Sequence, residues 1–441
     1  MIAIGIGTAV VPLDTSVNIA FPSITRAFDL TAGDMQWVVI CFVLTYASLM
    51  LVLGHVGDLF GHAAVLRAGL LWSIAALVLC AIAPSFAALL ACRILQGIGA
   101  ALILSCGAAL MTSLYDEARR SRVLGFYVMI FGLSSTLGPW FGGALLQLSG
   151  WQAIFWYRVP VAAAALVLMR GFPSPSPTGR RERLDVAGAA LLVLAVGAML
   201  LAFNRVHDWT AVPLFGLSIT AFAAFAWQEL RADKPVLDLR VFRLRGFAAI
   251  NLVSILVNLA AFSVWLLVPF YLAKLDTFSL LAAGGILSMG AAGTVIASPI
   301  AGLAVGRIAA ERLALAGAAM VSIGLATIGT WTNGTATYWL VGTLVLQGLG
   351  LGLFQLAYTD VVTASLPVRD RGVAGSLALV TRTLGTVGAA AIVFLVFQAL
   401  ETTEGFYAAF QHTFQSVALL ALAAAVVLAF GRGIRRAART T

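Results

Sequence analysis

Long apolar runs recur along the whole chain and are separated by short polar segments. Each run has about 18 residues or more, enough for a helix to cross a hydrocarbon core about 30 Å thick. The first run is interpreted as a span and not as a signal peptide, because no small-residue cleavage site follows it. The pattern predicts an all-α polytopic membrane protein with fourteen transmembrane helices, at residues 1–24, 36–56, 64–84, 87–114, 123–147, 151–170, 186–204, 210–229, 247–273, 278–305, 311–331, 337–363, 372–399 and 413–431.

Composition agrees with this pattern and excludes a soluble globular protein. Of the 441 residues, 61% are hydrophobic and only 10% are charged, whereas a soluble domain has about 25% charged residues. The four cysteines lie in predicted spans without metal-ligand spacing, and the four histidines lie near loops, far apart in sequence. We therefore expect no disulfide, no metal site and no His-based catalytic centre.

The net charge of +9 reflects membrane orientation and not a nucleic-acid partner. If every second loop is cytoplasmic, most Lys and Arg residues fall in cytoplasmic loops, as the positive-inside rule requires. The exceptions are Arg26, Arg205 and Lys274 outside, and Arg93, Arg158 and Arg382 within spans. We expect both termini in the cytoplasm. Arg outnumbers Lys, which favours a bacterial origin and hence the cytoplasmic (inner) membrane.

The chain contains an internal repeat. "LQGIG" at 95–99 returns as "LQGLG" at 346–350, and the glycines that bracket one loop, Gly54 and Gly69, return as Gly302 and Gly317. The spacing predicts a six-span half (1–170), a linker with two extra spans (171–245) and a second six-span half (246–441). Duplicated halves with a binding site between them at the membrane midplane are typical of secondary transporters.

Six stretches, in order along nearly the whole chain, resemble the motifs of one transporter family. They are "LDTSVNIAFP" (13–22), "QWVVICFVLTYA" (36–47), "GHVGDLFG" (54–61), "RILQGIGAA" (93–101), "GPWFGG" (138–143) and "PVLDLRVF" (235–242). The chain resembles the fourteen-helix drug:proton antiporter branch of the major facilitator superfamily. The resemblance implies a major facilitator fold of two six-helix halves plus two inserted helices.

The chain departs from the family pattern at three places. Basic residues usually follow the acid of the loop motif, but Leu59, His62 and Ala63 stand there. Gly54, Asp58 and Gly61 are the candidate gating motif of this loop. Asp58 has fewer basic partners nearby than in the family, so we expect a weaker ionic interaction to hold the inner gate. The second-half counterpart of the acid is Gly306. In "WQAIFWYRVP" (151–160), a cationic Arg158 replaces the neutral amide of the family.

Asp14 and Arg93 are the candidates for proton coupling. Asp14 lies near the middle of the first span, where an ionised carboxylate costs about 2.5 to 3.5 kcal/mol, so its protonation can follow its hydration. The alternative is a structural acid that is permanently paired or caps a kink near Pro12 and Pro22. A buried guanidinium needs a partner, so Arg93 either biases the protonation of Asp14 or is a hydrogen-bonded structural arginine.

The stretch "GPWFGG" is interpreted as a mobile helix surface. Gly138 and Gly142 lie four residues apart on one face and allow a neighbouring backbone to approach, while Pro139 bends the helix and Gly143 adds a further gap. The resemblance associates this antiporter motif with exporters. The alternative is an immobile seam for tight packing.

Further polar and aromatic side chains within the spans are candidates for a substrate cavity. Arg158 either faces the cavity, where it would favour neutral or anionic substrates, reaches an interface, or pairs with an acid. Asp360 and Arg382 are candidates for substrate contacts or for a second charge pair, and Asp360 fits a solvated helix end as well. The full set is Asn18, Gln96, Arg158, Trp265, Tyr271, Asp360 and Arg382.

The sequence thus predicts proton-coupled efflux of small hydrophobic drugs, antibiotics or related metabolites by alternating access. No phosphate-binding loop with Gly-Lys-Ser/Thr occurs, so we expect a proton gradient and no cofactor to supply the energy. We expect a monomer, with protons, a small-molecule substrate and the lipid bilayer as its partners. The alternatives are a metabolite uniporter or symporter of the same fold and, less favoured, an intramembrane enzyme or sensor.

Overall fold

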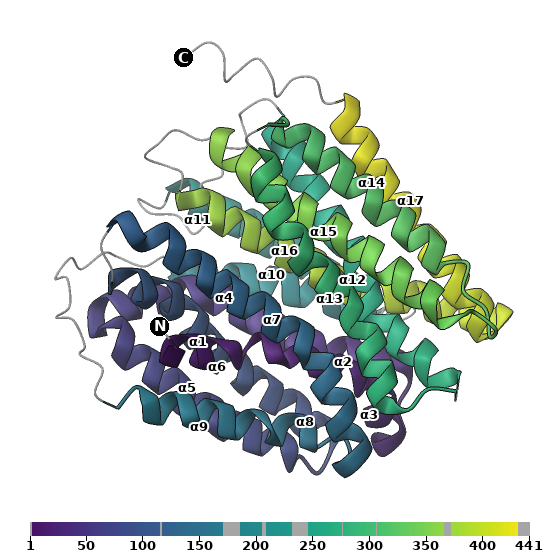
Figure 1. Cartoon of the computed structure of the whole chain (residues 1–441), viewed down its shortest axis with the longest axis horizontal. Coiled ribbons are helices and arrows are strands. Elements are labelled where there is room, and N and C mark those ends of the chain that lie inside the picture. The colour runs from purple at the N-terminus through teal and green to yellow at the C-terminus, as the bar shows by residue number, and fades with distance from the viewer. Residues whose placement is uncertain are drawn as a thin grey trace. The chain divides into compact units, whose positions relative to one another are not determined.

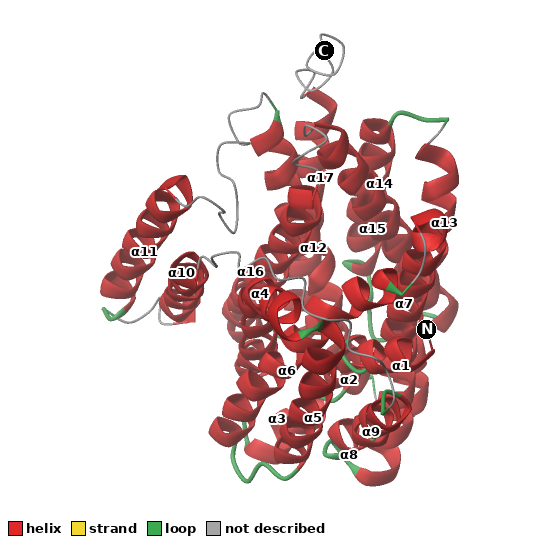
Figure 2. Ribbon diagram, turned by 90° about the vertical axis from the view of Figure 1, so that its left-hand side faces the viewer, coloured by secondary structure: helices red, strands yellow, loops and turns green. Residues whose placement is uncertain are grey.

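The computed structural model describes residues 2–114, 117–170, 186–204, 209–231, 246–275, 277–305, 307–365 and 372–430. Within these ranges every regular element is a helix, drawn red in Figure 2. Twelve of the described helical segments are long and apolar enough to cross a membrane. The inserted segment contributes α10 (Val186–Asn204) and α11 (Ala211–Arg231), and only α11 is among the twelve. The count of fourteen spans stays a prediction.

The chain divides into two compact units. The first, unit 1, comprises Met1–Gly197 and Asp276–Ser288, and the second, unit 2, comprises Ala198–Leu275 and Met289–Thr441. The division falls inside α10 and inside α13 (Leu280–Val305), so each of these helices contributes to both units. The predicted division into two six-helix halves and a linker follows the repeat instead, and it stays a prediction.

The first predicted span is broken into short pieces in unit 1. They are α1 (Ile2–Ala9), the 3-10 turn η1 (Pro12–Thr15), α2 (Ser16–Ile19) and α3 (Phe21–Phe28). Pro12 and Pro22 stand at the first or second position of η1 and α3. Proline lacks an N–H and clashes with the preceding turn, so a helix is readily interrupted at both points. The break places Asp14 in η1 and not in a regular helix.

The rest of unit 1 packs around this broken span. It comprises η2 (Ala32–Asp34), α4 (Met35–Phe60), α5 (His62–Ala81), α6 (Phe86–Ser113), α7 (Glu117–Ser149), α8 (Ala153–Trp156), α9 (Arg158–Leu168) and the parts of α10 and α13 named above (Figure 1). Helix α6 packs against α4 and α5, α9 against α5 and α1, and α7 against η1 and α2. Of the helices beyond the broken span, α7 packs directly against η1, the segment that carries Asp14.

Unit 2 contains the second copy of the repeat. Besides the parts of α10 and α13, it comprises α11, α12 (Phe247–Lys274), α14 (Ala310–Ile328), α15 (Thr337–Ser365), α16 (Gly372–Glu404) and α17 (Phe406–Phe430). Gly69 lies against Leu102 and Ile103 of α6, and its repeat counterpart Gly317 lies against the backbone of Phe354 and Gly350 in α15. A glycine at the corresponding position of the repeat therefore allows α5 to pack closely on α6 in unit 1 and α14 to pack closely on α15 in unit 2.

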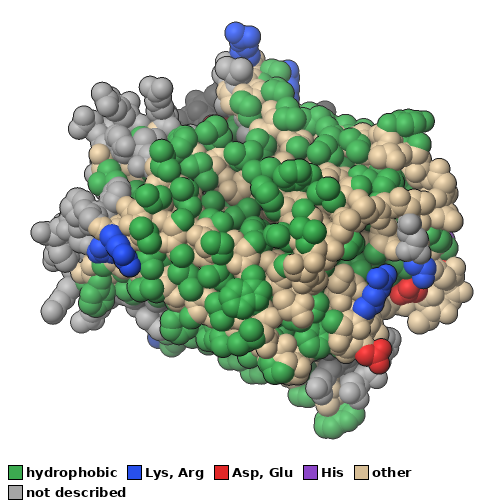
Figure 3. Space-filling model, turned by 60° about the horizontal axis from the view of Figure 1, so that its bottom comes forward, with side chains coloured by type: hydrophobic (Ala, Val, Ile, Leu, Met, Phe, Trp, Pro, Cys, Tyr) green, Lys and Arg blue, Asp and Glu red, His purple; other side chains and the backbone are tan. Residues whose placement is uncertain are grey.

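The surface is that of a protein surrounded by lipid. Hydrophobic side chains cover most of the face shown in Figure 3, while charged side chains appear near its margins. Large apolar side chains such as Leu148, Leu419 and Ile219 are more than 60% exposed. Exposed apolar area on this scale would be unstable in water, whereas it matches a bilayer.

Several predicted positions lie outside the described residues. They are the side chain of Asp58, the stretch 235–242 and Gly306, while Gly54 lies within α4. The remaining glycine of the loop motif, Gly61, lies between α4 and α5 with φ +87°. Such a φ strains any residue with a Cβ, so glycine is required for the turn from α4 into α5.

Candidate functional site

Asp14 is the centre of a hydrogen-bonded group of buried side chains in unit 1. Arg93 donates from Nη1 to Oδ1 at 2.7 Å and from Nη2 to Oδ2 at 2.8 Å. Gln96 donates from Nε2 to Oδ1 at 3.0 Å, and Arg158 donates from Nη1 to the same oxygen at 2.6 Å. The name charge cluster is used below for Asp14, Arg93, Gln96 and Arg158.

Arg93 is oriented by α4 and by its own helix. Its Nε donates to the carbonyl of Val38 at 3.0 Å, and its guanidinium lies 4.3 Å from the centre of the Phe42 ring. Its Nη1 also donates to Oε1 of Gln96, one helical turn ahead, at 2.7 Å. The two-pronged pair with Asp14 has the geometry in which guanidinium and carboxylate bind most strongly.

Arg158 also pairs with the acid. Its side chain is fully buried, so of the three placements considered from the sequence the structure shows the pair with an acid and not an interfacial position. Its Nε donates to the carbonyl of Ile154 at 3.2 Å, and its guanidinium lies 5.4 Å from the centre of the Phe155 ring. Its Nη2 is buried and has no hydrogen-bond partner among the residues that the structure describes.

The charge cluster contains one carboxylate and two guanidinium groups. With Asp14 ionised it carries one surplus positive charge, and with Asp14 protonated it carries two. Asp14 is 12% exposed, while Arg93 and Arg158 are 2% and 0% exposed. Buried charges are stable only when paired, so the protonation state of Asp14 decides whether both arginines have a counter-ion.

Tyr157 holds the broken segment in place, and sequence reasoning did not single it out. Its hydroxyl donates to the carbonyl of Leu13 at 3.0 Å and lies 3.1 Å from Oγ of Ser16. These atoms flank Asp14, and the carbonyl of Leu13 also accepts from the backbone N–H and the hydroxyl of Ser16. The available signal was its position next to Arg158, where the chain departs from the family pattern.

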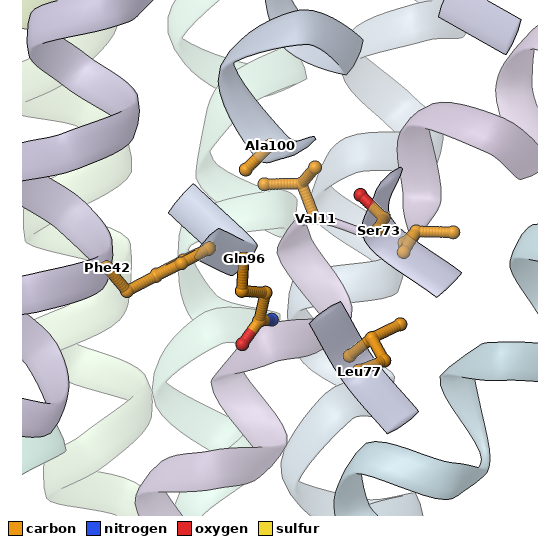
Figure 4. Close-up of a pocket in the computed structure, with 7 residues that line it drawn as sticks. Val11, Phe42, Ser73, Leu77, Gln96 and Ala100 are labelled. Carbon is orange, nitrogen blue, oxygen red and sulfur yellow. The ribbon is translucent and has the colours of Figure 1, made fainter. Parts of the chain in front are cut away.

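A small cavity of about 10 Å³ lies beside the charge cluster (Figure 4). Its walls come from Val10 and Val11, in the turn between α1 and η1, and from α4, α5 and α6, and they are mostly apolar, with Gln96 and Ser73 as the polar side chains. The volume is about that of one water molecule. Gln96 thus lies between this cavity and Asp14.

The stretch 138–143 lies in α7, and within unit 1 it contacts η1 and α2 on one side and the start of α13 on another. A Cβ at Gly138 would meet Oγ1 of Thr15, and one at Gly142 would lie 2.9 Å from Cβ of Ser16. On another side of α7, a Cβ at Gly143 would meet the carbonyl of Leu280, and a Cβ at Gly284 would meet the carbonyl of Pro139. The motif therefore brings η1 and α2, and the start of α13, into backbone contact with α7.

The candidate cavity residues are not all brought together. Gln96 and Arg158 meet on Asp14, and Asn18 is buried in α2 of the same unit. In unit 2, Trp265 is half-buried, whereas Tyr271 is buried, donates to the carbonyl of Thr332 at 2.7 Å and stacks on Phe410. Asp360 and Arg382 are exposed.

Unit 2 contains an uncharged polar network that sequence reasoning missed. Tyr358 donates to Oδ1 of Asn251 at 2.9 Å and lies 3.3 Å from Oγ1 of Thr381, which is 3.0 Å from Oγ of Ser254. Asn258 joins through Ser254, and Gln355 joins through Asn258. The network connects α12, α15 and α16. Its members are separate polar positions in apolar spans, and their meeting depends on how these helices pack.

Among the described residues, no group of three or more His, Cys, Asp or Glu side chains could hold a metal ion. The ionised side chains that the structure brings together in the charge cluster are one carboxylate and two guanidinium groups.

Comparisons with known proteins agree with this architecture. The family model described as Major Facilitator Superfamily matches residues 4–390. The multidrug resistance protein Stp of Mycobacterium tuberculosis (strain CDC 1551 / Oshkosh) is 31% identical over 400 residues, which cover 89% of this chain and 74% of the relative. The riboflavin transporter RibZ of Clostridioides difficile (strain 630) is 27% identical over 386 residues, covering 87% and 84%.

A similar solved structure is that of a bacterial homologue of the human lysosomal transporter Spinster. It has a TM-score of 0.72 and 16% sequence identity, and the match covers 98% of this chain and 96% of that one. At this identity the likeness concerns the fold.

Proposed function

Because the chain belongs to the major facilitator superfamily, and is thus a multi-pass membrane transporter of small molecules and not an enzyme, we propose that it exports small hydrophobic compounds in exchange for protons. The pairing of Asp14 with Arg93 and Arg158 inside a broken span carries the proposal. A buried carboxylate that is partly accessible and surrounded by cations can take up or release a proton as its surroundings change.

In the proposed cycle, Asp14 is the proton carrier and Arg93 its modulator. When the carboxylate is ionised it holds both arginines, and when it is protonated this attraction is lost. Once Asp14 is protonated, a conformation in which water reaches the cluster is favoured, because water can solvate the two arginines that have lost their counter-ion. Proton binding is then coupled to a change of conformation, which is the requirement for alternating access.

The glycine motif of α7 supplies the structural link in this proposal. Gly138 and Gly142 contact the segment that carries Asp14, while Gly143 contacts the start of α13. Because glycine has no side chain, few side chains at these contacts oppose a displacement of α7 relative to its neighbours. A shift of η1 on protonation can therefore be passed to α7 and from α7 to α13.

The relatives support export of drug-like compounds, since Stp is named a multidrug resistance protein. We propose the cytoplasmic membrane of a bacterium as the location, with both termini in the cytoplasm, and a monomer that uses the proton gradient without a cofactor. The basic loops support this orientation.

Transport into inside-out membrane vesicles tests the proposal. Ethidium and riboflavin serve as fluorescent probes, and an acid interior drives uptake. Wild-type protein is expected to accumulate at least one probe when the gradient is imposed and to lose it when an uncoupler is added. Asp14→Asn is expected to abolish gradient-driven accumulation. Undiminished accumulation by this variant would remove Asp14 from the mechanism.

A second candidate function is uniport or symport of a metabolite. Two observations favour it: the similarity to a riboflavin transporter and the surplus positive charge of the charge cluster, which suits a neutral or anionic substrate. Proton release distinguishes the two functions. An antiporter in detergent releases protons when substrate binds, whereas a symporter takes protons up under the same conditions.

A further inference from the structure

Arg158 adds a full positive charge to the charge cluster, although the hydrogen bonding of its guanidinium is incomplete. Its fully buried guanidinium makes one bond to Asp14 and one to the carbonyl of Ile154, and within the described part of the chain Nη2 has no hydrogen-bond partner. An arginine that served only to join two helices would be expected to have its buried N–H groups satisfied. The incomplete bonding therefore indicates that the charge matters.

Asp14 does not need Arg158 to satisfy its hydrogen bonds. Arg93 already binds both carboxylate oxygens, and Gln96 adds a third bond. An ordinary buried ion pair would be complete with these two residues. What Arg158 adds is a second positive charge, 2.6 Å from the carboxylate oxygen Oδ1.

We infer that Arg158 is a positioning residue that sets the pH range in which Asp14 exchanges its proton, by holding a second positive charge against the carboxylate. The inference rests on the proposed role of Asp14 as proton carrier. With Arg158 present, protonation of Asp14 leaves two buried cations without a counter-ion. With a neutral side chain in its place, protonation leaves one, so the proton is retained at higher pH.

The other groups around Asp14 in the described part of unit 1 do not duplicate this effect. Arg93 is the remaining cation, and it comes from α6. Cys80 of α5 and Tyr157 beside α9 lie within electrostatic reach, and Cys41 of α4 lies near Arg93. A thiol and a phenol are uncharged near neutral pH in ordinary surroundings. From α7 the contacts to η1 are a backbone carbonyl and glycines.

The anchoring of Arg158 fits a fixed electrostatic role. It is the first residue of α9, directly after Tyr157, which binds the carbonyl of Leu13. The two residues together fix the segment on both sides of Asp14. The distance from the second cation to the carboxylate is thus set by the same helix start that holds η1.

Infrared titration of the protein in lipid nanodiscs tests the inference without any substrate. The carboxylic acid C=O band of Asp14 is identified as the band that disappears in Asp14→Asn. Its midpoint is then measured in wild type, Arg158→Gln, Arg158→Asn and Arg158→Lys. Arg26→Gln is the matched control, because Arg26 is exposed on α3 and its loss removes the same formal charge.

We expect both neutral variants at position 158 to move the midpoint to higher pH by about 1 unit or more, the usual effect of one close opposite charge. Arg158→Lys is expected to stay near wild type, and Arg26→Gln to leave the midpoint unchanged. Two neutral variants are included in case one does not fold.

The two proposals fail in distinguishable ways. A band that titrates with the same midpoint in wild type and in the neutral variants would overturn the role of Arg158 and leave the proposed function intact. Equal shifts in Arg158→Lys and Arg158→Gln would also overturn it, because the charge would not matter. A band that does not titrate in any variant would overturn the proposed function together with the inference.

Discussion

Arg93 and Asp14, 79 positions apart in the sequence, form a two-pronged ion pair with N···O distances of 2.7 and 2.8 Å. Neither residue could satisfy its charge alone in an apolar span. The pair joins α6 to the broken first span, and Arg158 joins α9 to the same carboxylate. Three segments of unit 1 therefore depend on the charge of one side chain.

Replacement of Asp14 by Asn should destabilise the protein as well as uncouple transport from the proton gradient. The change leaves two buried arginines without a counter-ion, and removing one partner of a buried pair costs about 3 to 5 kcal/mol. We expect a lower midpoint of thermal unfolding in detergent. The double variant Asp14→Asn/Arg158→Gln removes one of the orphaned charges and should regain part of the loss. A double variant no more stable than Asp14→Asn would contradict the electrostatic account.

Replacement of Arg93 by Lys should impair transport although the charge is kept. Lysine is a point charge and cannot bind both carboxylate oxygens, Gln96 and the carbonyl of Val38 in one fork geometry. Gradient-driven uptake into vesicles should fall about tenfold or more, consistent with the loss of about 1.5 to 3 kcal/mol in charged hydrogen bonds. Arg26→Lys, at an exposed position, serves as control. Wild-type uptake by Arg93→Lys would show that the fork geometry is dispensable.

Replacement of Gly143 by Ala should slow transport by obstructing α7. The added Cβ would meet the carbonyl of Leu280, a backbone atom that cannot move alone. Forced overpacking of this kind costs about 1 to 3 kcal/mol. Gly302→Ala, in α13 itself, is the matched control because no atom of the described residues lies within 4 Å of its added Cβ. Initial uptake rates should fall for the first variant and stay near wild type for the second, and equal rates would contradict the contact.

Replacement of Tyr358 by Phe should lower the thermal stability of unit 2. The hydroxyl donates to Oδ1 of Asn251, and its removal takes this donor from a buried oxygen of α12, whereas Thr381 keeps its contacts with Ser254 and the carbonyl of Ala378. Such a loss costs about 1 to 3 kcal/mol, so the midpoint of thermal unfolding should fall. Tyr338→Phe is the control, since Tyr338 is 78% exposed. An unchanged midpoint for Tyr358→Phe would mean that the network adds no stability.

The hydrophobic pattern alone determined that the chain crosses a membrane many times, because the bilayer imposes a fixed length and polarity on each spanning helix. The repeat also had a local signature: Gly69 and Gly317 are visible in sequence because only glycine allows the backbone approach that both hairpins need. Asp14, Arg93 and Gln96 could be selected singly, since polar groups in apolar spans are costly and therefore conspicuous.

Tertiary structure decided which of these groups meet. Arg158 had three sequence-level placements, and only the packing of α9 against α1 and α5 brought it onto Asp14. Tyr157 and the network around Tyr358 carried no periodic signal, because a hydrogen bond between helices depends on the rotation and register of both. Hydropathy records the cost of burying a polar group, whereas the identity of its partner is a property of the packed helices.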